Sequence, residues 1–299
     1  MNLSLLARYL VEHYGKNWDE EFSLNGDVDS TEMKKLRSYI EHALDPFEQN
    51  VYANTPRYET IEDKINNLHP WYYPVTIQDI TVVPGKGTRQ EGSRLNERTA
   101  YRHKLLVDSV DYNFHLKSVL DIGSNCGYWS HQYFLKGAMY FDMIEGRRLY
   151  CQQAKLFWQN NTDCFFSIHH ANVLDDELWH TLWQSGKRDF VLCAGILYHI
   201  EQWEELLVKA LEITGEAILI DTRIADSDTK IEEPGGWHFD AIVETHIKCV
   251  PIYDRMIKII TDMGFSYKKL SIPDAIIPSD MLINDNYQTN KRVCLLCQI

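Results

Sequence analysis

From Lys117 onward, apolar segments of strand length alternate with segments of helix length. This alternation limits the fold, because strands linked by helices of about 10–15 residues form parallel sheets covered on both faces. The predicted strands span residues 117–123, 139–145, 164–171, 189–195 and 216–222. The predicted helices span residues 127–137, 147–160, 175–185 and 201–213. Beyond Pro251, the predicted elements are a helix at 253–263 and strands at 266–272 and 291–298. The sequence therefore predicts an α/β fold with a doubly wound, seven-stranded sheet.

The segment from Val119 to Gly127 is typical of a buried strand that ends in a glycine turn and opens a helix. Gly123 and Gly127 permit backbone angles and a close approach that a Cβ atom would block. At the carboxyl end of a strand, the backbone N–H groups of such a turn can hold a nucleotide-like ligand. Glu145 ends the next predicted strand, at a separation that suits binding of ribose hydroxyls. Asn125 stands where a dinucleotide site needs a second glycine, which disfavours a pyrophosphate but allows an adenosyl ligand.

At these residues the chain resembles class I S-adenosylmethionine (SAM)-dependent methyltransferases, and the resemblance covers roughly residues 69 to 299. The exit of the fourth predicted strand, Gly195-Ile-Leu-Tyr-His199, resembles the corresponding motif of small-molecule methyltransferases. It is also similar to the motif of bacterial tRNA wobble-uridine methyl- and carboxymethyltransferases, as is the segment His69-Pro-Trp-Tyr-Tyr-Pro74. The resemblance implies a Rossmann-like fold whose last strand inserts antiparallel, SAM as the cofactor, and in-line methyl transfer to an oxygen or nitrogen of a small-molecule acceptor.

The resemblance also implies roles for individual residues. The glycine turn would cradle the methionine part of SAM and Glu145 its ribose, while Asn172, where the family more often has aspartate, would border the adenine with Val173. The predicted cofactor-binding residues are Gly123, Ser124, Asn125, Gly127, Glu145, Gly146, Asn172, Val173, Cys193, Ala194 and Arg98. The predicted acceptor-binding residues are Tyr198, Trp71, Tyr72, Arg223, Trp237 and His238. His199 is the predicted general base, because imidazole titrates near neutral pH; the alternative is a histidine that caps a helix or orients the loop.

Arg94, Arg98 and Arg102 recur every four residues, so a helix there would place them on one face. That face could hold the carboxylate of SAM or an acidic substrate, or it could be solvated. The whole chain has a net charge of −13, which opposes general binding to nucleic acid. Two other functions stay open: modification of tRNA, and a non-catalytic protein that keeps the nucleotide fold as an interaction scaffold.

Residues 1–92 are predicted to form a helical, aromatic-rich cap ahead of a SAM-binding domain at residues 93–299, with a substrate-facing insertion at about 223–250. Thr60 and Asp63 have the spacing of a capping box at a helix start. No catalytic or ligand-binding motif is evident in the sequence of this N-terminal region. A lid over the site and a homodimer contact are both consistent with its pattern.

The seven cysteines are an odd number, and several fall in apolar, strand-like runs. Buried, reduced thiols in a cytoplasmic protein are the expectation. Cys294 and Cys297 lie within the last predicted strand, so a core role is favoured over a redox or metal motif. The acidic and histidine residues of the insertion lack a ligand spacing, and no metal is expected. No apolar run approaches the roughly 18 residues of a membrane span, and the N-terminus lacks the basic leader of a secretory signal.

Overall fold

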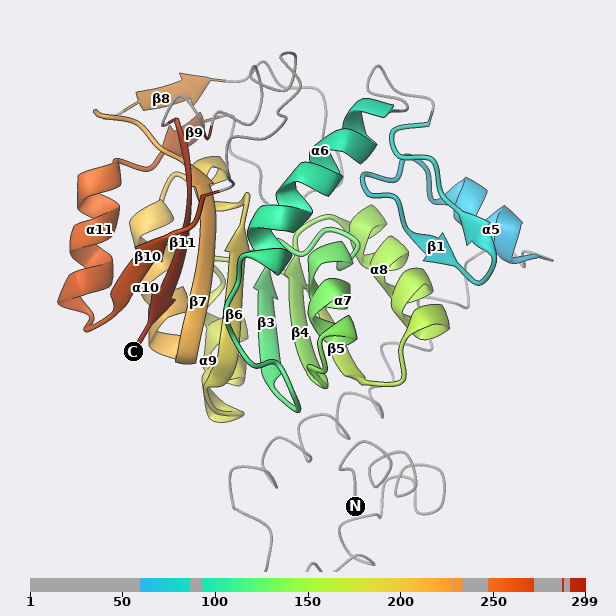
Figure 1. The fold of residues 1–299 in the computed structure, drawn as a ribbon, viewed down its shortest axis with the longest axis horizontal. Coiled ribbons are helices and arrows are strands. Elements are labelled where there is room, and N and C mark those ends of the chain that lie inside the picture. The colour runs from blue at the N-terminus through green and yellow to red at the C-terminus, as the bar shows by residue number, and fades with distance from the viewer. Residues whose placement is uncertain (1–59, 87–92, 228, 233–246, 272–286, 288–290) are drawn as a thin grey trace, which may run out of the picture.

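The computed structural model describes residues 60–86, 93–227, 229–232, 247–271, 287 and 291–299. At its centre lies a seven-stranded sheet with the order β10-β11-β7-β6-β3-β4-β5 (Figure 1). Its strands are β3 Ser118–Ile122, β4 Tyr140–Glu145, β5 Phe165–His170, β6 Arg188–Ala194, β7 Thr214–Arg223, β10 Ser266–Lys269 and β11 Arg292–Gln298. Strands β3 to β7 are mutually parallel, whereas β11 runs antiparallel to both β7 and β10.

Each strand of this sheet overlaps a strand that the alternating pattern predicts, so the predicted fold class is confirmed. The antiparallel insertion of the last strand, which the resemblance implied, is confirmed as well. Strand order reverses at β3, which pairs with β4 on one side and with β6 on the other. The carboxyl ends of β3 and β6 therefore form a topological switch point, where open α/β sheets bind their ligands.

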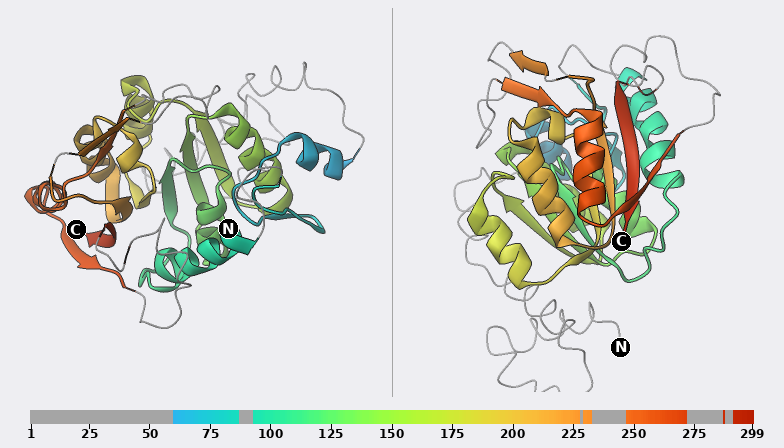
Figure 2. Two further views of the ribbon diagram at one scale, coloured as in Figure 1. Left: turned by 90° about the horizontal axis from the view of Figure 1, so that it is seen from above. Right: turned by 90° about the vertical axis from the view of Figure 1, so that its left-hand side faces the viewer.

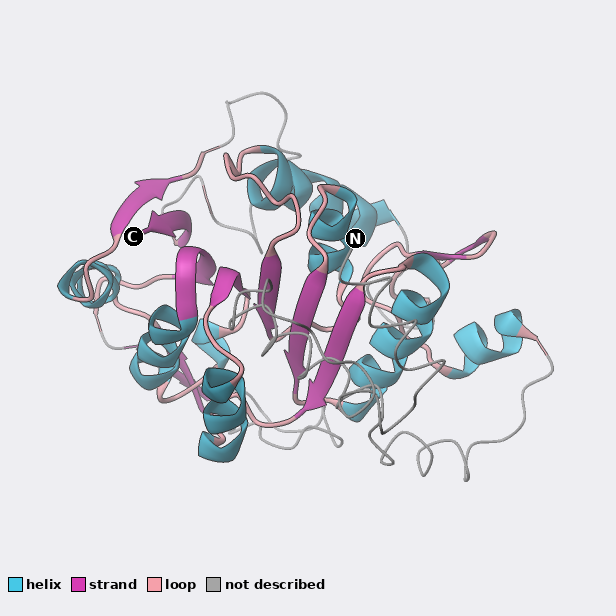
Figure 3. Ribbon diagram, turned by 90° about the horizontal axis from the view of Figure 1, so that it is seen from below, coloured by secondary structure: helices cyan, strands magenta, loops and turns pink. Residues whose placement is uncertain are grey.

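Helices cover both faces of the sheet (Figures 2 and 3). One layer contains α6 Ser93–His103, the π-helical segment η2 Lys104–Asp108, α7 Tyr128–Leu135 and α8 Arg148–Asn161. The other contains α9 Asp176–Gln184, α10 Trp203–Ile213 and α11 Tyr253–Asp262. Side chains alternate between two cores along each strand, so that Val119 packs with Trp158 of α8 while Leu120 packs with Trp179 of α9. The strands are apolar on both faces because both faces are covered.

Residues 60–86 pack on the sheet as a short helix and a small hairpin. Helix α5, Ile61–Asn67, has Thr60 as its N-cap residue, and the Thr60 Oγ1 accepts the Asp63 N–H at 3.1 Å, which confirms the predicted helix start. Strands β1, Thr76–Ile77, and β2, Ile80–Thr81, form the hairpin. Trp71, Tyr73 and Val75 are buried in the same core as α7 and α8. These residues thus share a core with the sheet, while the predictions for residues 1–59 lie outside the described part of the chain.

The predicted insertion at about 223–250 contains a paired element that the sequence pattern did not predict. Strand β8, Thr229–Glu232, runs antiparallel to β9, Ile247–Val250. Each strand is four residues long, and their pairing depends on a long-range register that local periodicity does not encode. In the sequence, the predicted acceptor residues Trp237 and His238 fall between the two strands, outside the described residues.

Most of the cysteines pack in the two cores. Cys294 and Cys297 lie in β11, are fully buried and belong to the cores on opposite faces of the sheet, which confirms the core-strand interpretation. All seven cysteines are free thiols. Within the described ranges, no cluster of three or more His, Cys, Asp or Glu side chains could hold a metal ion. Among the helices described, none is both long and apolar enough to cross a membrane.

Candidate functional site

The turn after β3 folds back over the end of β4. The N–H groups of Gly123 and Ser124 both donate to the carbonyl of Ile144, at 2.9 and 3.0 Å. Gly123 (φ +76°) and Asn125 (φ +54°) have left-handed backbone angles, a region that asparagine tolerates better than most side chains. The Oδ1 of Asn125 accepts the N–H of Cys126 at 2.8 Å and so stabilises the turn. A tight turn therefore stands at this switch point, as the sequence predicts.

Gly127, the N-cap residue of the following helix, is a packing glycine. It has φ +74°, and a Cβ atom at this position would lie 2.3 Å from Nε1 of Trp158 and 2.7 Å from Sδ of Met143. The indole of Trp158 donates to the Gly127 carbonyl at 3.3 Å. Helix α8 can therefore approach the start of α7 only because residue 127 has no side chain.

Glu145 ends β4 beside the glycine turn. The residue is 8% exposed, and its carboxylate accepts backbone N–H groups from Asn125 at 2.8 Å and from Arg147 at 2.9 Å. Burial raises the pKa of Glu145, and these hydrogen bonds oppose that shift. Because each carboxylate oxygen has two lone pairs, the group keeps acceptor capacity for hydroxyls of a ligand.

Two neighbouring features suit a polar ligand next to Glu145. The hydroxyl of Ser124 is buried and has no hydrogen-bond partner among the described residues. A buried hydroxyl without a partner is costly, unless a ligand supplies one. A Cβ atom at Gly146 would meet only the carbonyl oxygen of Ala171, at 3.7 Å, so the backbone there is accessible to a flat group.

The turn after β5 contains Asn172 and Val173. The Oδ1 of Asn172 accepts the Leu174 N–H at 3.1 Å, so the group it can offer to a purine is its amide nitrogen. The side chain of Val173 is 6% exposed and packs in the core with Trp179, whose indole donates to the Val173 carbonyl at 2.7 Å. The structure thus leaves only the backbone of Val173 to contact a ligand.

The exit of β6 contacts the glycine turn directly. A Cβ atom at Gly123 would lie 3.1 Å from the Ile196 side chain, which places residues 195–196 beside the turn. The N–H of Gly195 donates to the carbonyl of Asp221 on β7 at 2.7 Å. Cys193 is fully buried in the opposite core, and only Ala194 and the residues that follow reach this edge.

Tyr198 and His199 follow in a short 3₁₀ segment, η3 Leu197–His199, with ring centroids 4.2 Å apart. His199 is partly exposed, whereas Tyr198 is 9% exposed. The guanidinium groups of Arg223 and Arg292 lie over the Tyr198 ring, 5.0 and 5.5 Å from its centroid. Burial alone would raise the pKa of Tyr198, but Arg292 and Arg102 outweigh it and lower that pKa below 10.0.

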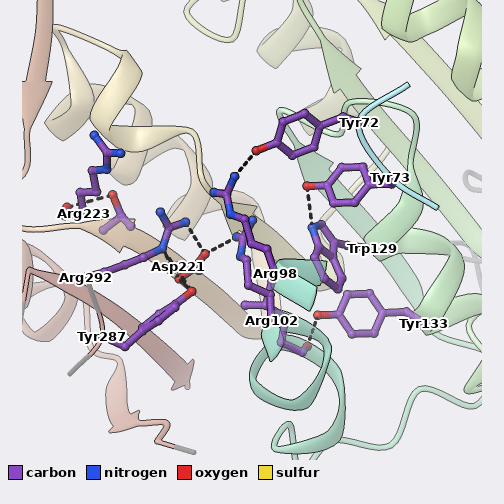
Figure 4. A network of polar contacts seen from close by, with 12 residues as sticks. Tyr72, Tyr73, Arg98, Arg102, Trp129, Tyr133, Asp221, Arg223, Tyr287 and Arg292 are labelled. Carbon is purple, nitrogen blue, oxygen red and sulfur yellow. Dashed lines mark hydrogen bonds and ion pairs between the residues drawn. The ribbon is translucent and has the colours of Figure 1, made fainter. Parts of the chain in front are cut away.

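A buried ionic cluster lies between α6 and the sheet (Figure 4). We name it the Asp221 cluster; it comprises Asp221, Arg102, Arg292 and Tyr287. Arg102 and Arg292 both donate to Oδ2 of Asp221, the latter at 2.6 Å, and the Tyr287 hydroxyl donates to Oδ1 at 2.7 Å. Asp221 is 0% exposed, and burial would raise its pKa, yet the two arginines hold it well below 3.8.

Of this cluster, sequence reasoning identified only Arg102, through the four-residue arginine spacing on α6. Asp221, Arg292 and Tyr287 were missed as site residues. The signal that could have drawn attention to Asp221 was a charged residue inside an otherwise apolar strand, near its carboxyl end. Asp121 gave the same signal: it is 2% exposed, accepts the Ser130 hydroxyl at 2.7 Å, and burial raises its pKa to about 7.

The aromatic segment before α6 divides into core and site residues. Trp71 is fully buried and donates from Nε1 to the Ile65 carbonyl at 3.1 Å, which leaves no surface for an acceptor. Tyr73 is also buried and accepts the indole N–H of Trp129 at 3.0 Å. Tyr72 is partly exposed, and its hydroxyl accepts from Arg98. Arg98 thus contacts the aromatic segment, next to the Asp221 cluster (Figure 4).

Comparisons with known proteins bear on the fold. No protein-family model and no curated protein sequence matches the chain. A similar solved structure is the N-terminal domain of EvdMO1 with S-adenosylhomocysteine (SAH) bound, at a TM-score of 0.53 and 17% identity, covering 80% of this chain and 94% of that one. The same domain in the presence of SAH and D-fucose gives the same values. The chain has a Rossmann-like methyltransferase fold. At this level of identity the likeness extends to the fold alone.

Proposed function

We propose that the protein is a SAM-dependent methyltransferase that transfers a methyl group to an oxygen or nitrogen of a small molecule. The observation that carries the proposal is the meeting of the glycine turn, Glu145 and the β6 exit at the switch point of the sheet. The solved domain of similar fold, which binds SAH, supports this assignment. The net charge of −13 favours a small acceptor over a polyanion.

The residues at the turn fit an adenosyl ligand. Glu145 would accept hydrogen bonds from the ribose hydroxyls, while the buried hydroxyl of Ser124 would gain a partner from the ligand. The backbone at Gly146 and the amide nitrogen of Asn172 would border the adenine. Gly123 and Asn125 keep the turn tight enough for its backbone to reach the methionine part of SAM.

The sulfonium of SAM, when bound, supplies a methyl group that is already activated for displacement. The contribution of this chain is then to align the acceptor, exclude water and receive the acceptor proton. We propose a ring nitrogen of His199 as the proton acceptor, since it is partly exposed at the β6 exit and histidine titrates near neutral pH. Tyr198, Tyr72 and Arg223 would contact the acceptor.

Calorimetric titration of the full chain with SAH tests the proposal. One-site binding with a dissociation constant of roughly micromolar strength is expected. Glu145→Gln should weaken it about tenfold, because one charged acceptor is lost. Glu177→Gln, at an exposed position on α9, is the matched control and should bind as the wild type does. An absence of SAH binding by the wild type would refute the proposal; binding would be followed by a mass-spectrometric search for acceptors that gain one methyl group.

A further inference from the structure

Building on the proposed methyl transfer, we propose that the acceptor carries a carboxylate or a phosphate, which the guanidinium groups of Arg102, Arg223 and Arg292 bind at the β6 exit. The proposal names a class of acceptor, small organic acids. It assigns these arginines to the acceptor and not to the cofactor.

Hydrogen-bond donors converge on one point beside Gly195. A Cβ atom built on Gly195 (φ +86°) would have three nearest neighbours: Nη2 of Arg292 at 3.7 Å, Nη2 of Arg102 at 3.8 Å and the Tyr198 hydroxyl at 3.9 Å. These are ordinary contact distances, so the position next to the Gly195 backbone is bounded by donors. Two guanidinium groups and a hydroxyl around one point match an oxyanion better than any neutral group, because guanidinium offers donors only.

The charges in and around the Asp221 cluster also favour an anionic acceptor. Arg102 and Arg292 both pair with the carboxylate of Asp221, and they are only 4% and 1% exposed. The Nε of Arg102 is buried and has no hydrogen-bond partner within the part of the chain that the structure describes. Arg223 forms no ion pair with any carboxylate among the described residues, and its guanidinium lies over Tyr198. Two guanidinium groups and one carboxylate together carry one positive charge, and an oxyanion on the ligand would offset part of the cost of burying that charge.

The Asp221 cluster lies close to the proposed SAM site, where an acceptor has to bind. Gly195 borders the arginines, while the next residue, Ile196, contacts the glycine turn at Gly123. The turn follows β3, and Arg223 ends β7, two strands away in the sheet. Adjacent strands are about 4.8 Å apart, so the backbone at Arg223 lies about 10 Å from the end of β3. An acid whose nucleophilic oxygen or nitrogen is a few bonds from its anionic group would span this gap.

The Asp221 carboxylate acts as the positioning group. By accepting from Arg102, Arg292 and Tyr287, it fixes both guanidinium groups at the β6 exit before any ligand arrives. Such preorganisation reduces the entropy lost on binding. Arg223, which is outside this network and partly exposed, is therefore the position at which charge can be removed with the least risk to folding.

The test uses the full chain, with Arg223→Gln as the variant and Arg223→Lys as the charge-preserving control. Sulfate, phosphate and acetate serve as anion probes and are titrated into SAH-saturated protein at constant ionic strength. Arg223→Gln should weaken their binding about tenfold, equivalent to about 1.4 kcal/mol, and Arg223→Lys should weaken it less. In an acceptor screen, acids should be methylated, whereas the matched neutral amides and esters should not.

The outcomes separate this inference from the proposed function. If wild-type protein does not bind SAH, both are overturned. If SAH binds but the anions bind equally well to Arg223→Gln, or neutral analogues are methylated as well as acids, the inference alone is overturned. If Arg223→Gln weakens SAH but not 5′-methylthioadenosine, which lacks the amino-acid part, the arginine holds the cofactor carboxylate and the inference is again overturned.

Discussion

Replacement of Gly127 by alanine should destabilise the protein through packing. Two costs add at this position. A left-handed backbone angle costs a residue with a Cβ atom about 1–2 kcal/mol. The new methyl group, 2.3 Å from Nε1 of Trp158 and 2.7 Å from Sδ of Met143, forces both side chains to shift, and such overpacking costs about 1–3 kcal/mol. The free energy of unfolding should therefore fall by about 2–5 kcal/mol.

Gly264 provides the matched control for this experiment. It also has a left-handed angle, φ +87°, but a Cβ atom there meets nothing within 4 Å. Gly264→Ala should lower the free energy of unfolding only by the cost of the left-handed backbone angle, about 1–2 kcal/mol. The effect of alanine on the unfolded chain is common to both variants. Urea unfolding followed by circular dichroism measures the free energy of unfolding of both variants. Equal losses in the two variants would refute the assignment of Gly127 to packing against α8.

Three further predictions concern charged and titratable groups. Asp221→Asn should lower the free energy of unfolding by about 3–5 kcal/mol at pH 7, because the buried arginines lose their carboxylate. The folded pKa of Asp221 is below 3.8, so the stability advantage of the wild type should shrink as the pH falls below that value. Urea midpoints of both proteins at pH 7 and pH 3 measure this change. Burial raises the folded pKa of Asp121 to about 7. The wild type should therefore lose stability relative to Asp121→Asn as the pH rises from 4 to 7, by at most about 1.4 kcal/mol per pH unit. A difference in unfolding free energy between the two proteins that stays constant over this pH range would contradict the prediction. His199→Asn should lower turnover by roughly 10²–10⁴-fold with unchanged SAH affinity, and a larger loss for Tyr198→Phe would transfer the base role to Tyr198.

Local periodicity was sufficient to predict the seven strands of the central sheet and the helices between them. The exact residues of a run such as Phe190–Ala194 matter little for this, because any apolar segment of strand length between amphipathic helices predicts the same parallel layer. The antiparallel direction of β11 came only from the family resemblance, since nothing in its residues distinguishes it from a parallel strand. The β8–β9 pair was missed because its two strands depend on each other for their hydrogen bonds.

The candidate site was harder to predict than the fold, because its contacts join distant segments. Trp158, whose indole meets Gly127, is 31 residues further along the chain, so the sequence alone suggested a ligand role for this glycine. Asp221 and Arg292 are 71 residues apart and meet only because β7 and β11 are neighbours. By contrast, the spacing of Arg98 and Arg102 was sufficient to predict a shared helix, and α6 confirms that helix.

The overall charge and the local charge of this protein act on different classes of ligand. A net charge of −13 repels a polyanion along its whole length, and no wide basic surface is evident from the sequence to oppose that repulsion. Salt screens such long-range effects beyond about 8 Å, so a small acid can approach the β6 exit without a large penalty. In the proposed complex it would meet Arg102 and Arg292, which are 4% and 1% exposed and so would interact strongly with a group small enough to reach them. For the acceptor proposed above, burial of the cations within an acidic protein would select for size as well as for charge, and would favour a small acid over RNA.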